Sequence, residues 1–451
     1  MSEHEAEIPS PPDGLFRDRR RRVLEQLGND VMVLPAAGIL HRSNDSELRY
    51  RPDSELHYLT GFEEPDAVLV LRGFADVDRS VLFTRARDRE AELWTGPREG
   101  PEGARERLGV EVAFPITELP ARLPELLLGA DRIHARLGVQ AALDTLLVTA
   151  LRLGRAKGAR EGTGPRGVLD PGGILDEMRV RKDSWEIERL RRAAQVTTHG
   201  FRTALAATAP GVGEWEIEAS LEGTFRRLGG AGPAFATIVG GGSNGCVLHY
   251  TDNRARLRAG DLVLVDAGAE VALYSGDVSR TWPVSGVLTD AQREVGRIVD
   301  RARARAIEAI GPGARIDDVH RSAVEVLVEG LLGLGLLRGD RDSLIEEGAH
   351  RRYFPHRTSH WLGIDTHDPG DYRVAGESRS LEPGMVLTVE PGLYFGPGSV
   401  AGVEEPPVHP EFLGIGVRIE DDVLVTPSGR EVLTADLPTD PEELGALVGA
   451  G

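Results

Sequence analysis

Apolar residues in the first third of the chain follow two alternating patterns, and each pattern predicts a different element. Spacings of three and four residues predict helices, whereas short apolar runs bounded by turn residues predict strands. The order along the chain is a helix at 15–27, strands at 31–34, 67–71 and 80–83, and a helix at 140–153. Helices that alternate with strands are typical of an α/β domain.

A glycine-rich stretch separates this region from the rest of the chain. Residues 154–173 contain seven glycines, together with Pro165 and Pro171, and show no periodicity. Such clusters mark loops and boundaries. An acidic, proline-rich segment at 1–14 predicts a disordered tail. The domains expected are therefore an N-terminal α/β domain with its linker at 15–173, and a second domain at 174–451.

The second domain contains a weak internal repeat. Capping boxes formed by Asp183 with Glu186 and by Thr289 with Gln292 predict the starts of two long helices. After each long helix a Pro-Gly pair, at 210–211 and at 312–313, introduces a further helix, and strands follow. A duplication of this kind predicts two similar halves that face each other, with a site between them.

Five side chains able to bind metal lie in or at the ends of short apolar runs in this domain. They are Asp266, Asp277, His360, Glu390 and Glu420. Burying a carboxylate costs several kcal/mol unless a partner compensates the charge. Four carboxylates at apolar strand ends, with one imidazole, predict a shared cation, and two divalent ions would balance the four charges. Ligands without a thiolate favour a hard or borderline ion such as Mn²⁺ over a structural zinc, with Co²⁺, Fe²⁺ and Zn²⁺ left open.

The local spacing places four of these five residues next to each other or next to a further polar residue. Asp266 and Asp277 flank a glycine-containing segment, so a hairpin would let both carboxylates converge. His356 and His360 are four residues apart and share a face in a helix or a strand. Arg418 and Glu420 are two apart on a predicted strand and share a face. For Arg418 a cross-strand salt bridge is the competing interpretation.

The glycine run at 240–245 formally matches the dinucleotide pattern G-x-G-x-x-G and the nucleophile pattern G-x-S-x-G. Both patterns require a helix immediately afterwards. Residues 246–250 instead predict a strand, and residues 251–253 predict a turn. We therefore favour a glycine-rich hairpin loop that lets His249 approach a pocket. A nicotinamide-dependent oxidoreductase has no support beyond this run.

Composition narrows the partners and the compartment. Lysine and arginine number 53 against 72 acidic residues, a formal net charge of −19, which argues against nucleic acid and anionic membranes as principal partners. Cys246 is the only cysteine, so an intrachain disulfide and a thiolate metal cage are excluded. No apolar run approaches the length of a membrane span. These features predict a cytoplasmic protein.

The same stretches closely resemble the Xaa-Pro aminopeptidases (aminopeptidase P), which belong with prolidase and methionine aminopeptidase to the "pita-bread" metallopeptidases. The matching segments are 246–251, 262–268, 275–281, 356–368, 388–394 and 416–421. In the first domain, 45–47 and 58–62 resemble the N-terminal domain of aminopeptidase P. The resemblance implies an α/β (α+β) fold, with an N-terminal creatinase/aminopeptidase P-type domain and a C-terminal pita-bread catalytic domain.

The resemblance also implies roles for single residues. One metal would be held by Asp277, His360, Glu390 and Glu420, and the other by Asp266, Asp277 and Glu420. His249, His356 and His367 match substrate-binding and intermediate-stabilising histidines, and Arg418 matches an active-site arginine. We assign Glu390 to relay a proton to the leaving nitrogen, and His356 and Tyr394 to line the proline pocket. Creatinase shares the fold without these metal ligands.

The activity implied is metal-dependent hydrolysis of the N-terminal Xaa-Pro bond in peptides whose second residue is proline. The family suggests a homo-oligomer, either a dimer or a tetramer. The nearest alternative is prolidase, which is restricted to Xaa-Pro dipeptides. An alternative from another class is a non-catalytic peptide-binding protein that kept the pita-bread fold.

Overall fold

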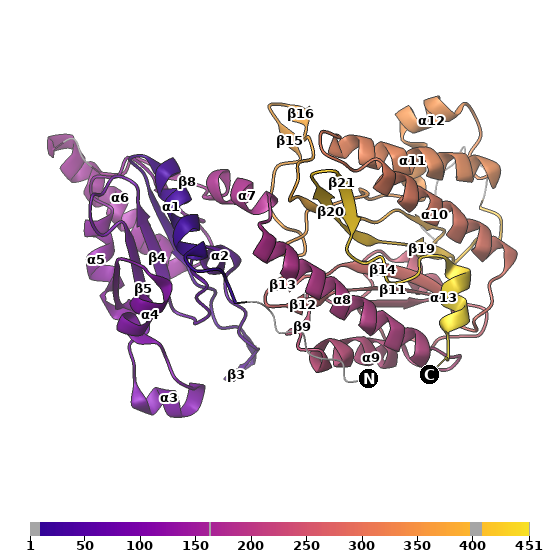
Figure 1. Ribbon diagram of the computed structural model, residues 1–451, viewed down its shortest axis with the longest axis horizontal. Helices are drawn as coiled ribbons and strands as arrows, with labels where there is room; N and C mark the ends of the chain where they lie inside the picture. Colours follow the sequence, from indigo (N-terminus) through magenta and orange to yellow (C-terminus); the bar gives the residue numbers. More distant parts are fainter. Residues whose placement is uncertain (1–9, 162–163, 397–407, 451) are drawn as a thin grey trace. The chain divides into compact units, whose positions relative to one another are not determined.

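The computed structural model describes residues 10–161, 164–396 and 408–450. The chain divides into two compact units, one ending at Glu177 and the other running from Met178 onwards (Figure 1). The boundary predicted at 154–173 lies just before this division. Of the tail predicted at 1–14, the first nine residues lie outside the described residues.

The first unit contains a mixed six-stranded sheet in the order β6-β5-β4-β1-β7-β8. Central strand β1 pairs antiparallel with β4 and parallel with β7. In this order the strands are Val112–Pro115, Ser80–Thr84, Val68–Arg72, Val31–Pro35, Ile133–His134 and Val168–Leu169. A short hairpin is formed by β2 (His41–Ser43) and β3 (Ser46–Glu47). The core of this unit lies between the sheet and apolar residues of α5 and α6.

The helices of the first unit confirm most of the predicted pattern. They are α1 Leu15–Leu27, α2 Ser54–Thr60, α3 Arg89–Thr95, α4 Gly100–Leu108, α5 Leu119–Leu126 and α6 Ala141–Glu161. Helix α6 continues eight residues beyond the predicted end at 153. Gly154 lies within the helix rather than at its end, and a Cβ there would lie 2.9 Å from Cδ of Pro165.

The second unit has two pairs of long helices. The first pair is α8 (Ser184–Ala207) and α9 (Glu214–Arg227), and the second is α10 (Asp290–Glu308) and α11 (Ile316–Gly333). Both predicted capping boxes are present, at Asp183 before α8 and at Thr289 before α10. Shorter helices are α7 (Gly172–Val180), which spans the division, α12 (Arg341–Glu347) and α13 (Pro441–Leu447).

The strands of this unit form several small antiparallel sheets. The sheet β10-β11-β14 consists of Ile238–Gly241, Leu262–Ala267 and Val278–Pro283, and β13-β12-β9 consists of Tyr274–Ser275, Ala269–Val271 and Gly232–Pro233. The sheet β17-β20-β21 consists of Val386–Val389, Asp421–Thr426 and Gly429–Val432. Strand β18 (Gly392–Tyr394) pairs with β19 (Gly416–Arg418), and β15 (Arg373–Val374) with β16 (Glu377–Ser378).

Each helix pair packs against its own strands, as the repeat predicts. Apolar residues of α8 and α9 share a core with β11, β12 and β14, whereas those of α10 and α11 share a core with β17, β19 and β20. Figure 1 draws α9 below strands β11 and β14, and α10 and α11 above them. The two halves are joined where the amide of Glu420 donates to the carbonyl of Ser279 at 3.0 Å.

The glycine run at 240–245 is not followed by an α-helix. Strand β10 ends at Gly241, a 3₁₀ turn spans Gly242–Cys246, and the next α-helix begins only at Asp290. This removes the only support for a dinucleotide site or a serine nucleophile. The strand predicted at 246–250 is also absent, and this segment belongs to the loop of the β10–β11 hairpin. Within the described residues, no helix is both long and apolar enough to cross a membrane.

Candidate metal centre

Two of the five predicted ligands meet on one hairpin. Strands β11 and β14 pair antiparallel with Asp266 opposite Ser279, and Asp277 directly precedes β14. A Cβ at Gly268 would lie 1.7 Å from the carbonyl oxygen of Gly276, so only glycine lets the two arms close. The hairpin therefore brings both carboxylates to one place, as predicted.

The other three ligands come from the second half of the unit. The backbone around His360 runs beside β17. The amide of Thr388 donates to the His360 carbonyl at 2.9 Å, and the amide of Glu390 donates to the Thr358 carbonyl at 2.8 Å. Glu420 lies between β19 and β20 and is bonded to β14 through Ser279. All three thus reach the hairpin from strands next to it.

The potential ligand atoms lie close together. One atom from each of Asp277, His360 and Glu420 lies within 4.8 Å of the others. The Nε2 of His360 is 3.4 Å from Asp277 Oδ2 and 3.8 Å from Glu390 Oε1. Asp266 lies beside this group: it pairs with Ser279, whose hydroxyl donates to Glu420, and its charge raises the pKa of Asp277, Glu390 and Glu420. The structure brings all five predicted residues together.

The electrostatics of this cluster fit a bound cation. Burial, and then the neighbouring carboxylates, raise the pKa of Asp277 and Glu420 well above the usual range, and burial raises that of Glu390 to about 7. The Oδ1 atom of Asp266 is buried without a hydrogen-bond partner. Crowded buried carboxylates with an unused oxygen are unfavourable alone and are matched by divalent ions. The donor set, oxygen and imidazole nitrogen without thiolate, fits such ions.

Comparisons with known proteins match this chain along almost its whole length. Residues 188–427 match the model for metallopeptidase family M24, and residues 16–134 match that for the aminopeptidase P N-terminal domain. The Xaa-Pro aminopeptidase of Escherichia coli is 44% identical over 96% of this chain and 97% of its own length. The chain belongs to metallopeptidase family M24.

Solved structures give the same result for this M24 protein. An aminopeptidase from Pseudomonas aeruginosa superposes with a TM-score of 0.91 and 40% identity, covering 98% of this chain and 99% of that one. A zinc-substituted E. coli aminopeptidase P in complex with product gives a TM-score of 0.90 and 43% identity, covering 98% and 99%. The resemblance to aminopeptidase P and the fold it implied, an N-terminal aminopeptidase P-type domain and a pita-bread domain, are confirmed.

Beside the metal cluster of the M24 domain, three residues form a directed hydrogen-bond chain. The Nδ1 of His356 lies 2.9 Å from the Arg357 carbonyl, and because a carbonyl only accepts, Nδ1 carries the hydrogen. The Nε2 of His356 therefore accepts from the Tyr394 hydroxyl at 2.8 Å. The oxygen of that hydroxyl accepts in turn from Arg418 Nη1 at 3.0 Å. Burial, and then the Arg418 cation, lower the pKa of His356 to about 3. The 3.4 Å approach of its Nδ1 to Glu390 is therefore not an ion pair.

Arg418 makes the cross-strand ion pair of the competing interpretation and also lies beside the predicted ligands. Its Nη2 lies 2.6 Å from Asp266 Oδ2, so it makes an ion pair across the strands. Its Nε donates to Ser279 Oγ at 2.9 Å, and the side chain is buried against the ligands. The guanidinium of Arg418 therefore compensates the charge of Asp266 and lies at the edge of the group of candidate ligands.

The remaining predicted histidines lie at the edge of the cluster. His367 packs edge-on against His360 with ring centroids 4.5 Å apart, and burial lowers the pKa of His367. His249 is exposed and interacts electrostatically with both His356 and His367. The carbonyl of Leu248, next to it, accepts from Arg418 Nη2 at 3.5 Å.

Sequence reasoning missed further residues that contact the predicted ligands, among them Ser279 and Asp422. Ser279 Oγ donates to Glu420 Oε2 at 2.8 Å, and Asp422 Oδ2 accepts from the amide of Asp277 at 3.1 Å. Each lies two residues after a predicted ligand in or beside a strand, which puts it on the same face. That spacing was the signal available in the sequence.

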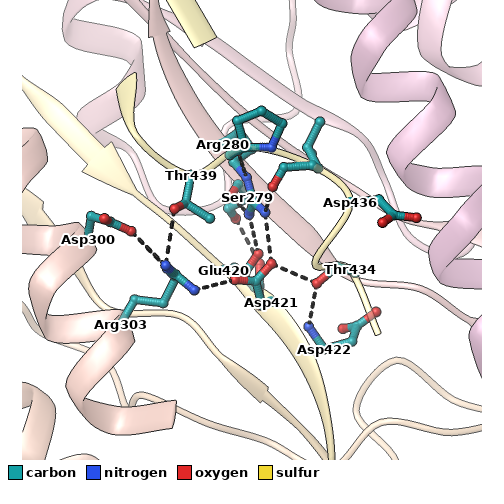
Figure 2. Close-up of polar contacts among 12 residues, drawn as sticks. Ser279, Arg280, Asp300, Arg303, Glu420, Asp421, Asp422, Thr434, Asp436 and Thr439 are labelled. Atoms are coloured by element: carbon teal, nitrogen blue, oxygen red, sulfur yellow. Dashed lines mark hydrogen bonds and ion pairs between the residues drawn. The ribbon is translucent and has the colours of Figure 1, made fainter. Parts of the chain in front are cut away.

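A buried ionic network supports Glu420 from behind (Figure 2). Asp421 accepts from Arg280 Nη2 at 2.8 Å and from Arg303 Nη1 at 2.7 Å, and Arg280 Nη1 donates to the Glu420 carbonyl at 2.5 Å. Although burial acts to raise it, the two guanidinium groups hold the pKa of Asp421 below its usual value. The network fixes the backbone that carries Glu420.

Proposed function

We propose that this M24 protein is a Xaa-Pro aminopeptidase, which removes the first residue from peptides with proline in the second position in a metal-dependent reaction. The observation that carries the proposal is the convergence of ligand atoms from Asp277, His360 and Glu420 within 4.8 Å. The Xaa-Pro aminopeptidases of E. coli and Haemophilus influenzae, 44% and 38% identical over nearly the whole chain, support it.

The cofactor is a pair of divalent ions, for which Mn²⁺ is our assignment. Asp277, His360, Glu390 and Glu420 would hold one ion, and Asp266, Asp277 and Glu420 the other. When bound, such a pair lowers the pKa of a shared water and polarises the scissile carbonyl. The all-oxygen-and-imidazole donor set, without cysteine, supports a hard or borderline ion.

The side chains around the cluster handle the charge and the proton. Attack on the carbonyl before proline places negative charge on its oxygen, and His249 or His367 donates a hydrogen bond to that oxyanion. An X–Pro bond has no N–H, so recognition cannot depend on that group. Glu390, whose pKa burial raises to about 7 in the metal-free protein, relays a proton to the leaving prolyl nitrogen.

The proline ring binds against His356 and Tyr394. The hydrogen-bond chain from Arg418 through Tyr394 to His356 holds both rings. Phe354 packs edge-on against His356 with centroids 4.6 Å apart and adds an apolar surface behind it. A rigid wall made of rings is suited to a compact saturated ring such as pyrrolidine.

Peptides with proline second are thus the partners, rather than nucleic acid or membranes, and the net charge of −19 supports that choice. We assign the protein to the cytoplasm because its single cysteine rules out an intrachain disulfide. We also propose a homo-oligomer, a dimer or a tetramer, which light scattering at several protein concentrations tests directly.

The deciding experiment compares substrates on protein reconstituted with Mn²⁺. An Xaa-Pro-Xaa tripeptide is cleaved after its first residue, the matching Xaa-Ala-Xaa peptide is not, and the Xaa-Pro dipeptide is a poorer substrate. Asp277→Asn and Glu420→Gln abolish the cleavage. Cleavage of the dipeptide alone would identify a prolidase instead. Protein that binds Mn²⁺ and peptide but leaves every substrate intact would favour the non-catalytic alternative.

A further inference from the structure

A buried carboxylate outside the metal cluster gathers four hydrogen bonds. Glu214, the first residue of α9, has no exposed surface. Its Oε1 accepts from the amide of Gly241 and from Asn244 Nδ2, both at 2.9 Å. Its Oε2 accepts from the Tyr250 hydroxyl at 2.9 Å and the amide of Ala255 at 2.7 Å.

The donors to Glu214 come from both ends of one loop. Gly241 and Asn244 lie where strand β10 ends, whereas Tyr250 and Ala255 lie on the return toward β11. The Asn244 amide also donates to the Tyr250 hydroxyl at 3.0 Å, which links the two ends directly. The carboxylate therefore closes the loop from Gly241 to Ala255, and His249 lies within it.

The chemistry of the contact specifies a carboxylate. All four groups around Glu214 donate, and an ionised carboxylate offers about four lone-pair sites and no hydrogen. A glutamine in its place would turn an NH₂ group toward two of these donors. A buried donor left without an acceptor costs about 1–3 kcal/mol, so the loop would shift to recover its bonds.

The backbone of His249 is held on both of its sides. The carbonyl of Leu248 accepts from Arg418, and the hydroxyl of Tyr250 donates to Glu214. Accepting the proposed function, we infer that Glu214 is a positioning residue for the reaction: it holds the loop so that the His249 imidazole stays beside His356 and His367 at the metal cluster. Within the described residues, the hydrogen-bond partners of the Glu214 carboxylate include none of the predicted metal ligands.

The chain offers a matched control in the same helical turn. Glu216 is exposed, and its carboxylate accepts from the amide of Gly213 at 2.6 Å without contacting the loop. We expect Glu214→Gln to lower kcat/KM on an Xaa-Pro tripeptide by about 10–100-fold, the range for a displaced supporting group, with Mn²⁺ content unchanged. Glu216→Gln retains wild-type kinetics.

Two readouts separate positioning from a general loss of structure. If Glu214 acts through His249, the double variant Glu214→Gln/His249→Ala is no slower than His249→Ala alone. In hydrogen exchange, the amides of Gly241 and Ala255 exchange faster in Glu214→Gln than in Glu216→Gln, while core strand amides are unchanged. Additive losses in the double variant, or unchanged exchange of both amides, would overturn the inference.

A milder variant keeps the test valid if Glu214→Gln does not fold. Tyr250→Phe removes one of the four bonds to Glu214 together with the bond from Asn244, and it is expected to slow the reaction by about 3–10-fold, an effect of the size of ordinary hydrogen bonds. Its effect must also vanish in the His249→Ala background; a loss that persists there contradicts the inference. A wild-type enzyme unable to cleave Xaa-Pro peptides would refute the proposed function. An active wild type together with a Glu214→Gln variant of unchanged kcat/KM would refute only this inference.

Discussion

The guanidinium of Arg418 lies 2.6 Å from the carboxylate of Asp266, and the same group also donates to Tyr394 and to Ser279. These three acceptors lie in different directions. A planar guanidinium with five N–H groups can reach them at once, whereas an ammonium group cannot. Arg418 therefore compensates part of the cluster's charge and orients two of its neighbours.

Arg418→Lys keeps the charge and removes this geometry. We expect kcat/KM on an Xaa-Pro tripeptide to fall by about 10²-fold, the effect of a misplacement near 1 Å. Steady-state kinetics with Mn²⁺ in excess measure the loss. Arg258→Lys, at an exposed position, is the matched control and stays at wild-type rates. Equal activity of the two variants would show that charge alone suffices at residue 418.

Removing the metal should lower stability as well as activity. Ions that bind the folded protein at 100 times their dissociation constant stabilise it by about 2.7 kcal/mol. Chelator-treated protein should therefore melt at a lower temperature, and Mn²⁺ should restore the melting temperature and the activity together. A melting temperature that does not respond to Mn²⁺ while activity returns would contradict this coupling.

Asp277→Asn tests whether the metal-free cluster is strained by its own charges. Burial and the adjacent carboxylates raise the pKa of Asp277, so its ionised form is unfavourable in the fold. We expect the metal-free variant to melt no lower than the metal-free wild type, and to gain nothing from Mn²⁺. Differential scanning calorimetry in chelator, then in Mn²⁺, measures both. Asp252→Asn, on the exposed part of the loop, should behave as wild type.

The sequence predicted the elements that depend on local chemistry. The helix at Leu15–Leu27 follows from apolar spacing along one segment, and the caps at Asp183 and Thr289 from residue pairs within one helical turn. The candidate metal ligands were recognisable because a charged residue at the end of an apolar run is unfavourable without a cation.

What escaped prediction depends on contacts between distant residues. Glu214 binds donors up to 41 positions away, and Asp422 reaches an amide 145 positions away. For Glu214, nothing in the neighbouring residues distinguishes it from a surface acid, whereas for Asp422 the only local signal was its position two residues after Glu420. The close approach of Pro165 to Gly154 is likewise a contact that the local periodicity does not reveal.

The pH dependence of stability should carry a contribution from His320. Burial, and then Arg357 nearby, lower its pKa from 6.5 to about 4, while its Nδ1 bonds Thr358 Oγ1 at 2.8 Å. The unfolded chain binds the imidazole proton of His320 more tightly than the folded chain does. The contribution of His320 to the free energy of unfolding is therefore complete above pH 6.5 and is lost as the pH falls toward 4. Urea unfolding of metal-free protein at pH 7, 5.5 and 4.5 measures the slope.

His320→Asn places an amide group where Nδ1 was and removes the titration. We expect a shallower loss of unfolding free energy between pH 6.5 and 4.5 than in wild type. The exposed His199 on α8 provides the control, since His199→Asn should leave the slope unchanged. If both variants follow the wild-type curve, the burial of His320 does not govern its titration.

The network behind Glu420 should be the most sensitive part of the catalytic unit. Asp421 compensates Arg280, which is fully buried, and Arg303, and it also accepts from Thr434 Oγ1 at 2.6 Å (Figure 2). Asp421→Asn leaves buried guanidinium charge without its counterion. Breaking a buried pair in this way costs about 3–5 kcal/mol.

Chemical denaturation of Asp421→Asn measures that cost, and Asp436→Asn, an exposed aspartate in the segment that closes over the network, is the control. Because Arg280 also donates to the carbonyl of Glu420, Mn²⁺ affinity should fall in the first variant and not in the second. Loss of stability with unaltered Mn²⁺ affinity would mean that the network holds the strands together without orienting the ligand. A loss of both stability and Mn²⁺ affinity would mean that the network orients Glu420 through its backbone carbonyl, which Arg280 contacts.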